Sequence, residues 1–375
     1  MSVKVSIQLL SDYDPARVGE AMSALLAPLG GTGAFITDQN TVVLKPNLLA
    51  PRRVEKAVST HPEIVRATAN QLQSAGVSRV LVTDSSGIGS ATMCARKLGL
   101  VKNGVLEIVN PDEADWVTSK EAGMWKLHLS TLMRTYPVIN IAKAKTHGQM
   151  VMSAAVKNMF GAVIGLEKAQ WHYRIGRDPL RFGRLLVHIC ETIAPALNIL
   201  DGVIGMEGNG PGSGTPRPLG ILMASENAHA LDAVLCRIWK LHPEKIYTLR
   251  AAKEMGVLPD EKEIEIIGPP IQTLHPSPDW KMAAEHSVGK LAGPEWMTPL
   301  FEKLLKTTPH IHHPACTMCM ECVHHCAAEA MDASSGRIEI DMKKCISCFC
   351  CQEMCPHGAI TVQSGTLAKL LRLGR

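Results

Sequence analysis

The stretch CTMCMECVHHC at residues 316–326 is matched in spacing by CISCFCCQEMC at residues 345–355. Both follow the pattern C-x2-C-x2-C-x3-C, and the second begins 29 residues after the first. Pro356 follows the last cysteine of the second stretch, whereas Ala327 stands at the corresponding position of the first. The repeat indicates an internal duplication, and it contains nine of the twelve cysteines of the chain.

The spacing of these cysteines suits a cubane iron–sulfur cluster. Three thiolates two residues apart can hold one cluster in a tight loop, and the fourth thiolate must come from elsewhere. In ferredoxins with two clusters, the fourth cysteine of each block ligates the cluster of the other block. The repeat therefore predicts a small α+β, ferredoxin-like domain with two [4Fe–4S] clusters. The predicted ligands are Cys316, Cys319, Cys322 and Cys355 for one cluster, and Cys345, Cys348, Cys351 and Cys326 for the other.

Zinc is the alternative metal for such a group of cysteines. Zinc sites usually take four ligands in pairs, and two blocks of three plus one fit that arrangement poorly. Cys350 is an additional thiol beside Cys351, and we interpret it as a small buried residue; a redox role or an exchange of ligands is the alternative. Cys94, Cys190 and Cys236 stand alone in apolar helical segments and are interpreted as core residues.

The composition is that of a globular protein with one large and one small domain. Of the 375 residues, 46% are apolar and only 4% aromatic, so we expect an aliphatic core. A formal net charge of +4, evenly scattered, gives no indication of nucleic-acid binding. Met1–Leu10 lacks the pattern of a targeting signal, and the most apolar stretch, Leu185–Leu200, is interrupted by Glu191 and Pro195. We therefore expect a cytoplasmic protein without a membrane span.

Short apolar runs alternate with helical patterns over the first two-thirds of the chain. The runs are nearly continuous in Val, Ile and Leu, as in strands buried on both faces of a parallel sheet. The predicted strands are Thr41–Leu44, Arg79–Thr83, Val105–Val109, Pro137–Ile141, Leu197–Leu200, Leu219–Met223 and Glu263–Ile267. The predicted helices are Pro15–Leu26, Pro62–Ser74, Ser90–Leu98, Met150–Phe160, Leu180–Ile193, Ala228–Trp239 and Pro243–Glu254. This alternation predicts a large α/β domain with a mostly parallel sheet.

The chain is therefore expected to have four parts. The α/β domain spans residues 1–268, and a proline-rich connecting segment spans residues 269–308, with one or two helices expected at Trp280–Ala284 and Pro299–Lys306. The two-cluster domain follows at residues 309–363. The last part, residues 364–375, is short and basic and is predicted to form a tail helix.

Polar side chains follow the predicted strands at the points where the strands end. Lys45 and Asn47 follow one strand, Asp84 follows the next, and the sequence KAKTH at residues 143–147 follows a third. Asp201 follows a fourth strand. In open α/β sheets the carboxyl ends of the strands line one crevice, and ligands bind there. The sequence therefore predicts a ligand site at this crevice.

The residue types at the crevice limit its chemistry. Several lysines predict an anionic ligand, such as a carboxylate or a phosphate, and His147 can transfer protons near neutral pH. Asp84, Asp201, Glu207 and His147 can alternatively hold a divalent metal. The segment 202–214 contains six glycines and can form an anion nest, a lid or a plain turn. Neither a P-loop nor a nicotinamide-binding motif is present, and a flavin has no motif to support it.

Six segments of the chain, together with the double cysteine block, resemble the family of iron–sulfur proteins that contains the domain of unknown function 362. They are VVLKPNLL at 42–49, VTDSSG at 82–87, NIAKAKTHG at 140–148, AAVKNMFGAVIG at 154–165, ILDGVIGMEGNGPGSG at 199–214 and HALDAV at 229–234. The resemblance implies a large α/β domain fused to a two-cluster ferredoxin domain. It also implies a pocket, in which we assign catalysis to Lys145, His147, Lys157 and Asp201. Substrate binding is assigned to Lys45, Asn47, Asp84, Asn158, Glu207 and Asp232.

Three functions fit these features. The first is a reductase, an oxidoreductase that passes electrons through the two clusters to an anionic substrate or a second cofactor in the crevice. The second is an electron-transfer protein that docks a partner enzyme, an electron donor or acceptor. The third is a redox or ligand sensor without turnover. A polar crevice on a separate large domain favours the first function, because an electron carrier has little need of one.

Overall fold

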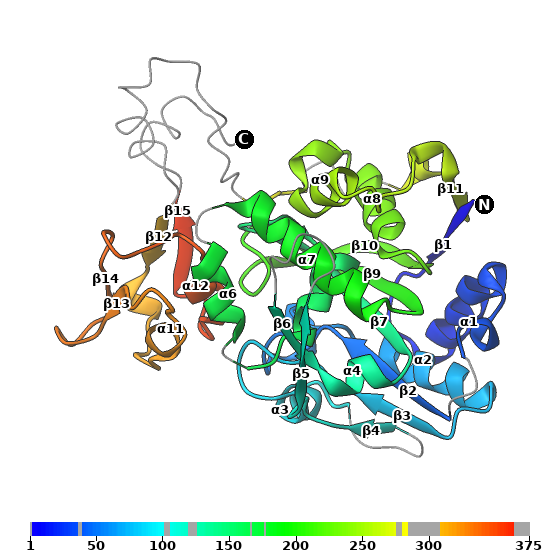
Figure 1. Cartoon of the computed structure of the whole chain (residues 1–375), viewed down its shortest axis with the longest axis horizontal. Helices are drawn as coiled ribbons and strands as arrows, with labels where there is room; N and C mark the ends of the chain where they lie inside the picture. Colours follow the sequence, from blue (N-terminus) through cyan, green and yellow to red (C-terminus); the bar gives the residue numbers. More distant parts are fainter. Residues whose placement is uncertain are drawn as a thin grey trace.

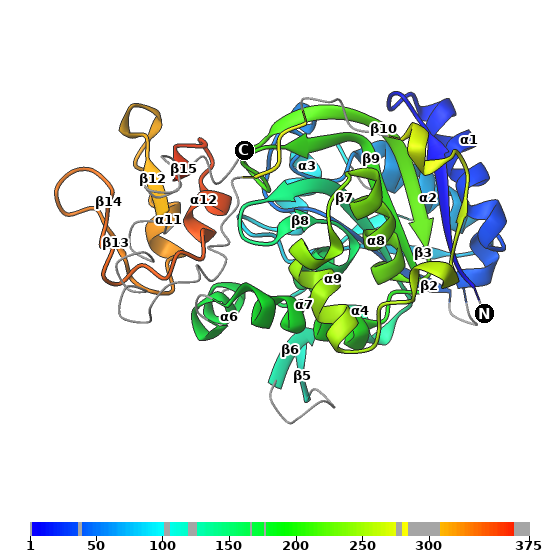
Figure 2. The same ribbon diagram turned by 90° about the horizontal axis from the view of Figure 1, so that it is seen from above.

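The chain forms a mixed nine-stranded sheet flanked by helices, with a small cysteine-rich part beside it (Figures 1 and 2). The computed structural model describes residues 2–36, 40–100, 106–118, 126–165, 167–175, 178–274, 280–283 and 308–363. We call the part up to residue 274 the α/β body and residues 308–363 the cysteine module.

The main sheet has the order β11-β1-β10-β9-β7-β2-β3-β4, with β8 paired to β7. Five of its eight pairings between described strands are parallel, so the prediction of a mostly parallel α/β sheet is confirmed. The strands are β1 (Val3–Leu9), β2 (Thr41–Pro46), β3 (Arg79–Val82), β4 (Leu106–Ile108), β7 (Val138–His147), β8 (Val151–Ser153), β9 (Leu197–Glu207), β10 (Thr215–Ser225) and β11 (Ile264–Ile267).

Helices cover both faces of this sheet. The helices of the α/β body are α1 (Pro15–Leu26), α2 (Pro62–Ser74), α3 (Ala91–Lys97), α4 (Thr131–Thr135), α5 (Ala155–Asn158), α6 (Glu167–Ile175), α7 (Pro179–Ile193), α8 (Ala228–Ile238) and α9 (Tyr247–Glu254). Val42 and Leu44 of β2 pack with α1 and α2 on one face. Val43 between them belongs to the core on the other face, which also contains residues of α7, α8 and α9. This alternation explains why the strands are apolar at nearly every position.

One prediction about these elements is wrong, and one strand was missed. Met150–Phe160 is not one helix, because β8 turns back and pairs with the end of β7, placing Val151 opposite His147; only the later part becomes α5. A short apolar run such as Met150–Phe160 fits a helix or a strand about equally well. The sheet also contains β1, between β11 and β10, which was not predicted, although Val3, Val5 and Ile7 alternate with polar residues.

A second, separate sheet joins β5 (Ala114–Thr118) to β6 (Lys126–Ser130) as an antiparallel ribbon. Figure 2 shows this ribbon projecting from the α/β body on the side of α4 and α7.

The cysteine module repeats one backbone form twice. Its elements are β12 (Thr308–Ile311), α11 (Glu321–His324), β13 (Met331–Asp332), β14 (Glu339–Ile340), α12 (Cys350–Met354) and β15 (Ile360–Gln363). Met318 and Ser347, which are 29 residues apart, both have left-handed backbone angles, as do Met320 and Phe349 just before α11 and α12. The internal duplication in the sequence is therefore also a duplication of structure.

Parts of the predicted organisation lie outside the described residues. They include most of the connecting segment 269–308, the predicted helix Pro299–Lys306 and the tail 364–375. Residues 280–283, where another helix was expected to begin, are described and are not helical. Within the described ranges, no helix has both the length and the apolar character needed to cross a bilayer.

Candidate functional site

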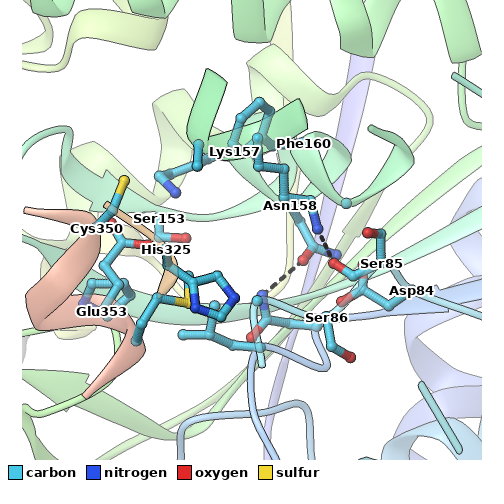
Figure 3. Close-up of a pocket in the computed structure, with 18 of the residues that line it drawn as sticks. Asp84, Ser85, Ser86, Ser153, Lys157, Asn158, Phe160, His325, Cys350 and Glu353 are labelled. Carbon is cyan, nitrogen blue, oxygen red and sulfur yellow. Dashed lines mark hydrogen bonds between the residues drawn. The ribbon is translucent and has the colours of Figure 1, made fainter. Parts of the chain in front are cut away.

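A cavity of about 250 Å³ lies where the α/β body meets the cysteine module (Figure 3). Its lining from the α/β body includes Lys45, Asn47, Asp84, Ser85, Lys145, Lys157, Asn158, Phe160, Lys168 and His172. The cysteine module contributes His325, Cys350, Glu353 and Met354. Figure 3 shows Cys350, His325 and Glu353 on one side and Asp84, Ser85 and Ser86 on the other.

The neighbouring strands β2, β3 and β7 place the first charged groups. Lys45 lies near the end of β2, Asp84 follows β3, and Lys145 lies near the end of β7, so all three meet at one edge of the sheet. Lys45 Nζ lies 2.8 Å from Asp84 Oδ1, and both side chains are buried. Gly161 passes so close that a Cβ there would lie 1.9 Å from Asp84 Oδ1. A residue without a side chain is therefore required at this position.

Lys145 is almost fully buried, and its side chain donates hydrogen bonds to two neutral acceptors. Its Nζ donates to Asn47 Oδ1 and to the carbonyl oxygen of Val58, both at 2.8 Å. Burial, followed by repulsion from Lys157, lowers the pKa of Lys145 to about 7. This amine can therefore gain or lose a proton near neutral pH.

Helices α5 and α6 add two further lysines. Lys157 of α5 is partly buried in the cavity wall, and Asn158 beside it donates to Asn140 Oδ1 at 2.7 Å, which ties α5 to β7. Lys168 of α6 donates to the carbonyl oxygen of Ser85. Burial lowers the pKa of Lys168 to about 8, although Asp84 acts in the opposite direction.

His147 reaches the cavity through Glu353. The Nδ1 atom of His147 accepts from the backbone N–H groups of Gln149 and Met150, so the ring proton of the neutral imidazole lies on Nε2. His147 Nε2 lies 2.9 Å from Glu353 Oε1, and both side chains are buried. Burial lowers the pKa of His147 to about 4. Burial opposes ionisation of Glu353, but His147 and Lys157 outweigh it and hold the pKa of this carboxyl well below its usual range.

The cysteines of each predicted set lie near one another. Cys316, Cys319, Cys322 and Cys355 line one small apolar pocket of the cysteine module. Burial raises the pKa of the Cys351 thiol, and the neighbouring sulfurs of Cys348, Cys345, Cys322 and Cys326 raise it further. The members of the second set therefore lie close together, with Cys322 of the first set also nearby, and none of the twelve cysteines forms a disulfide.

Backbone N–H groups point at matching sulfurs in the two blocks. Ala330 N–H donates to Cys326 Sγ at 3.3 Å, and Ala359 N–H donates to Cys355 Sγ at 3.2 Å. Both pairs are separated by the 29-residue offset of the duplication. Such bonds stabilise negative charge on sulfur, and they are one means by which proteins set cluster potentials.

A family model described as a domain of unknown function, DUF362, matches residues 42–237, which is just over half of the chain. The chain belongs to the DUF362 family. It is 38% identical over 267 residues to the thylakoid-associated protein sll1697 of Synechocystis sp., covering 70% of this chain and 83% of that protein. The match to the family model includes the four cavity lysines, Lys45, Lys145, Lys157 and Lys168.

This DUF362 protein also has two short matches and one weak structural likeness. It is 42% and 40% identical over 45 residues to indolepyruvate oxidoreductase subunit IorA of Methanothermobacter thermautotrophicus and of Archaeoglobus fulgidus. These matches span 12% of this chain and 7% of each subunit. A crystal structure of a Thermotoga maritima protein aligns at a TM-score of 0.37 and 14% identity, over 53% of this chain and 52% of that chain, which is too weak to identify a fold.

Four predicted site residues of the DUF362 protein do not line the cavity. His147 contacts it only through Glu353, and the other three are Asp201, Asp232 and Glu207. Asp201 lies 2.8 Å from Lys143 Nζ and accepts from the hydroxyl of Tyr13 at 2.7 Å. Lys143 and Asp201 are register neighbours on β7 and β9, so the strand-end lysine and carboxylate neutralise each other. Asp201 therefore lies outside the cavity, and its assignment to catalysis stays a prediction.

Asp232 and Glu207 have structural partners elsewhere. Asp232 accepts from the N–H groups of Ala155 and Val156 at the start of α5, and thereby orients the helix that carries Lys157. Glu207 accepts from the N–H of Lys281 at 3.0 Å. Both residues therefore lie outside the cavity lining, and their assignment to substrate binding stays a prediction.

The predicted divalent-metal donors Asp84, Asp201, Glu207 and His147 do not gather into one group among the described residues. The described residues that do come together with metal-ligand chemistry are Cys190, Glu191 and His229, on α7 and α8.

The glycine-rich segment 202–214 forms the end of β9 and the turn from β9 to β10, which agrees with the predicted alternative of a turn. This turn also contacts the cysteine module. Gln352 Nε2 donates to the carbonyl oxygen of Asn209 at 2.9 Å, and a Cβ on Gly212 would lie 3.0 Å from the carbonyl oxygen of Glu353. Arg52 donates to the carbonyl oxygens of Cys355, at 2.8 Å, and Pro356. These contacts hold the module over the cavity.

Lys168 and Glu353 were not predicted as site residues. Lys168 lies on a helix with no apolar periodicity strong enough to predict it, and Glu353 stands between two cysteines of the second block. No local pattern connects either residue with the strand ends, because both reach the cavity through long-range docking.

Proposed function

We propose that this protein is an iron–sulfur oxidoreductase in which the cysteine module holds two [4Fe–4S] clusters and the cavity holds the molecule that exchanges electrons with them. One observation carries the proposal. The cavity has lysines on the side of the α/β body, and on the other side it has His325 and Cys350. These two residues are the immediate neighbours of the predicted cluster ligands Cys326 and Cys351.

The spacing of the sulfurs supports clusters rather than zinc. Around one zinc ion, Zn–S bonds of about 2.3 Å in a tetrahedron place the sulfurs about 3.8 Å apart. No three cysteines of the cysteine module, all of them described, have sulfurs that lie within 4.8 Å of one another. Cysteine sulfurs that lie further apart than zinc requires, on two loops of the same form, leave room for the larger four-iron cube.

The proposal gives each group of residues a separate role. When bound, the clusters would supply single electrons. Lys145 and Lys157 would bind and orient an anionic substrate, and Lys145, with its pKa near 7, can hold or release a proton at Nζ. His147 Nε2–H, facing Glu353, fixes the position of the carboxylate that faces the cavity. Cys319 is exposed, so an electron donor or acceptor protein can approach the set of cysteines to which it belongs.

Metal analysis of protein purified without oxygen tests this proposal. We expect about eight iron and eight sulfide per chain, as two [4Fe–4S] clusters require, and an electron paramagnetic resonance signal after reduction by dithionite. Replacing Cys345 by serine should remove about half of the iron, whereas Cys94→Ser, outside both sets, should leave the iron content unchanged. Stoichiometric zinc with no sulfide would refute the proposal.

A further inference from the structure

The charged groups that line the cavity do not balance. Four lysines face two carboxylates, Asp84 and Glu353. Both carboxylates already have close partners in the protein: Asp84 lies 2.8 Å from Lys45, and Glu353 lies 2.9 Å from His147. If all six groups are ionised, the cavity carries an excess of two positive charges.

Among the residues that the structure describes, Lys145, Lys157 and Lys168 have no carboxylate at salt-bridge distance. Lys145 donates to an amide oxygen and a backbone carbonyl, and Lys168 donates to the backbone carbonyl of Ser85. Lys157 and Lys145 repel each other. Buried charges without an ionic partner are unfavourable by several kcal/mol, and the lowered pKa values of Lys145 and Lys168 reflect this cost. An anion placed between these amines would offset it through charge-assisted hydrogen bonds.

The size of the cavity limits that anion. A volume of about 250 Å³ lies just below the range of pockets that enclose drug-sized ligands. Phe160 and Met354 contribute apolar surface, so the polar contacts concentrate at the lysines. Figure 3 shows Lys157 and Glu353 both directed into the space beside His325. A small ligand in contact with Lys157 would therefore also lie against the cysteine module.

We propose that the cavity binds a compact dianion, either a phosphate group or a small dicarboxylate, with Lys145, Lys157 and Lys168 as its cationic contacts. The inference rests on the proposed function, because it names the substrate class of the same cavity. Two negative charges match the excess of two lysines, whereas a monoanion leaves one amine unpaired. A third negative charge would face the carboxylate of Glu353.

Calorimetry under anaerobic conditions, at fixed ionic strength and with the intact protein, tests the inference. The probes are inorganic phosphate, succinate and acetate. We expect phosphate or succinate to bind at least tenfold more tightly than acetate. Tighter binding of phosphate would indicate a phosphate group as the natural ligand, and tighter binding of succinate would indicate a dicarboxylate. Lys157→Gln should weaken that binding at least tenfold, while Lys157→Arg should retain most of it. Lys262→Gln, an exposed lysine next to β11 at the far edge of the sheet, is the matched control and should bind as the wild type does.

Equal affinities for the three probes, or unchanged binding in Lys157→Gln, would overturn the inference. Iron and sulfide content, measured on the same preparations, shows that each variant has folded and loaded its module. The two proposals fail separately. Loss of dianion selectivity in a protein with full clusters contradicts only the dianion, and dianion binding by a protein that contains zinc contradicts only the iron–sulfur assignment.

Discussion

Replacing Gly161 by alanine tests whether the buried Lys45–Asp84 ion pair in the cavity wall depends on the close approach of the Gly161 backbone. The added Cβ would lie 1.9 Å from Asp84 Oδ1 and 2.6 Å from Lys45 Nζ, so the pair must separate. Their side chains are only 4% and 1% exposed, and water cannot replace the lost contact. Breaking a buried ion pair costs about 3–5 kcal/mol. We expect the free energy of unfolding to fall by about that amount.

Urea unfolding followed by circular dichroism measures this loss. Gly33→Ala is the matched control, because no atom lies within 4 Å of a Cβ at Gly33 and its backbone angles suit alanine. The control should be neutral or stabilising by about 0.4–1 kcal/mol. If Gly161→Ala loses less than about 1 kcal/mol, the ion pair does not depend on this close approach and the reasoning is refuted.

Three further predictions follow from the other contacts. Succinate affinity, measured by calorimetry, should fall between pH 6 and pH 8 as Lys145, with a pKa of about 7, loses its proton. In Lys145→Met the fall in affinity should move to higher pH. A pH profile equal to that of the wild type would contradict the role of this amine. Cys350→Ser should keep the iron and sulfide content of the wild type, since Cys350 is not a predicted ligand, and loss of about half of the iron would make it one. Lys143→Met leaves Asp201 buried without its partner amine. The free energy of unfolding, measured by thermal unfolding, should therefore fall by about 3–5 kcal/mol, while succinate affinity stays unchanged. Weaker succinate binding would place this pair in the cavity.

The sequence was sufficient to locate one wall of the site. Lys45, Asp84 and Lys145 could be grouped because parallel strands bring their carboxyl ends to one edge of a sheet. The same rule misplaced Asp201, because β9 continues beyond the predicted strand and sets Asp201 against Lys143. Neighbouring opposite charges on adjacent strands neutralise each other, and a rule based on strand ends does not contain that information.

The other wall could not be predicted from local patterns. The cysteine spacing predicts what the module binds, but not where the module docks. Its position depends on contacts across long stretches of chain, such as Gln352 with Asn209 and Arg52 with Cys355. Glu353 becomes a site residue through these contacts. Lys168 enters the cavity in the same way, through the packing of α6.

The central claim is that one of two clusters lies directly beside the cavity. A redox titration of wild type, Lys157→Glu and Lys262→Glu, monitored by electron paramagnetic resonance, tests this claim. A change of two charge units about 10 Å from a cluster shifts its potential by roughly 0.1 V at an effective dielectric constant of about 20, and the shift falls with distance. We predict that Lys157→Glu lowers the reduction potential of one cluster clearly more than that of the other, and that Lys262→Glu has a much smaller effect on both. Equal potentials in Lys157→Glu and wild type, or equal shifts of both clusters, would contradict the claim.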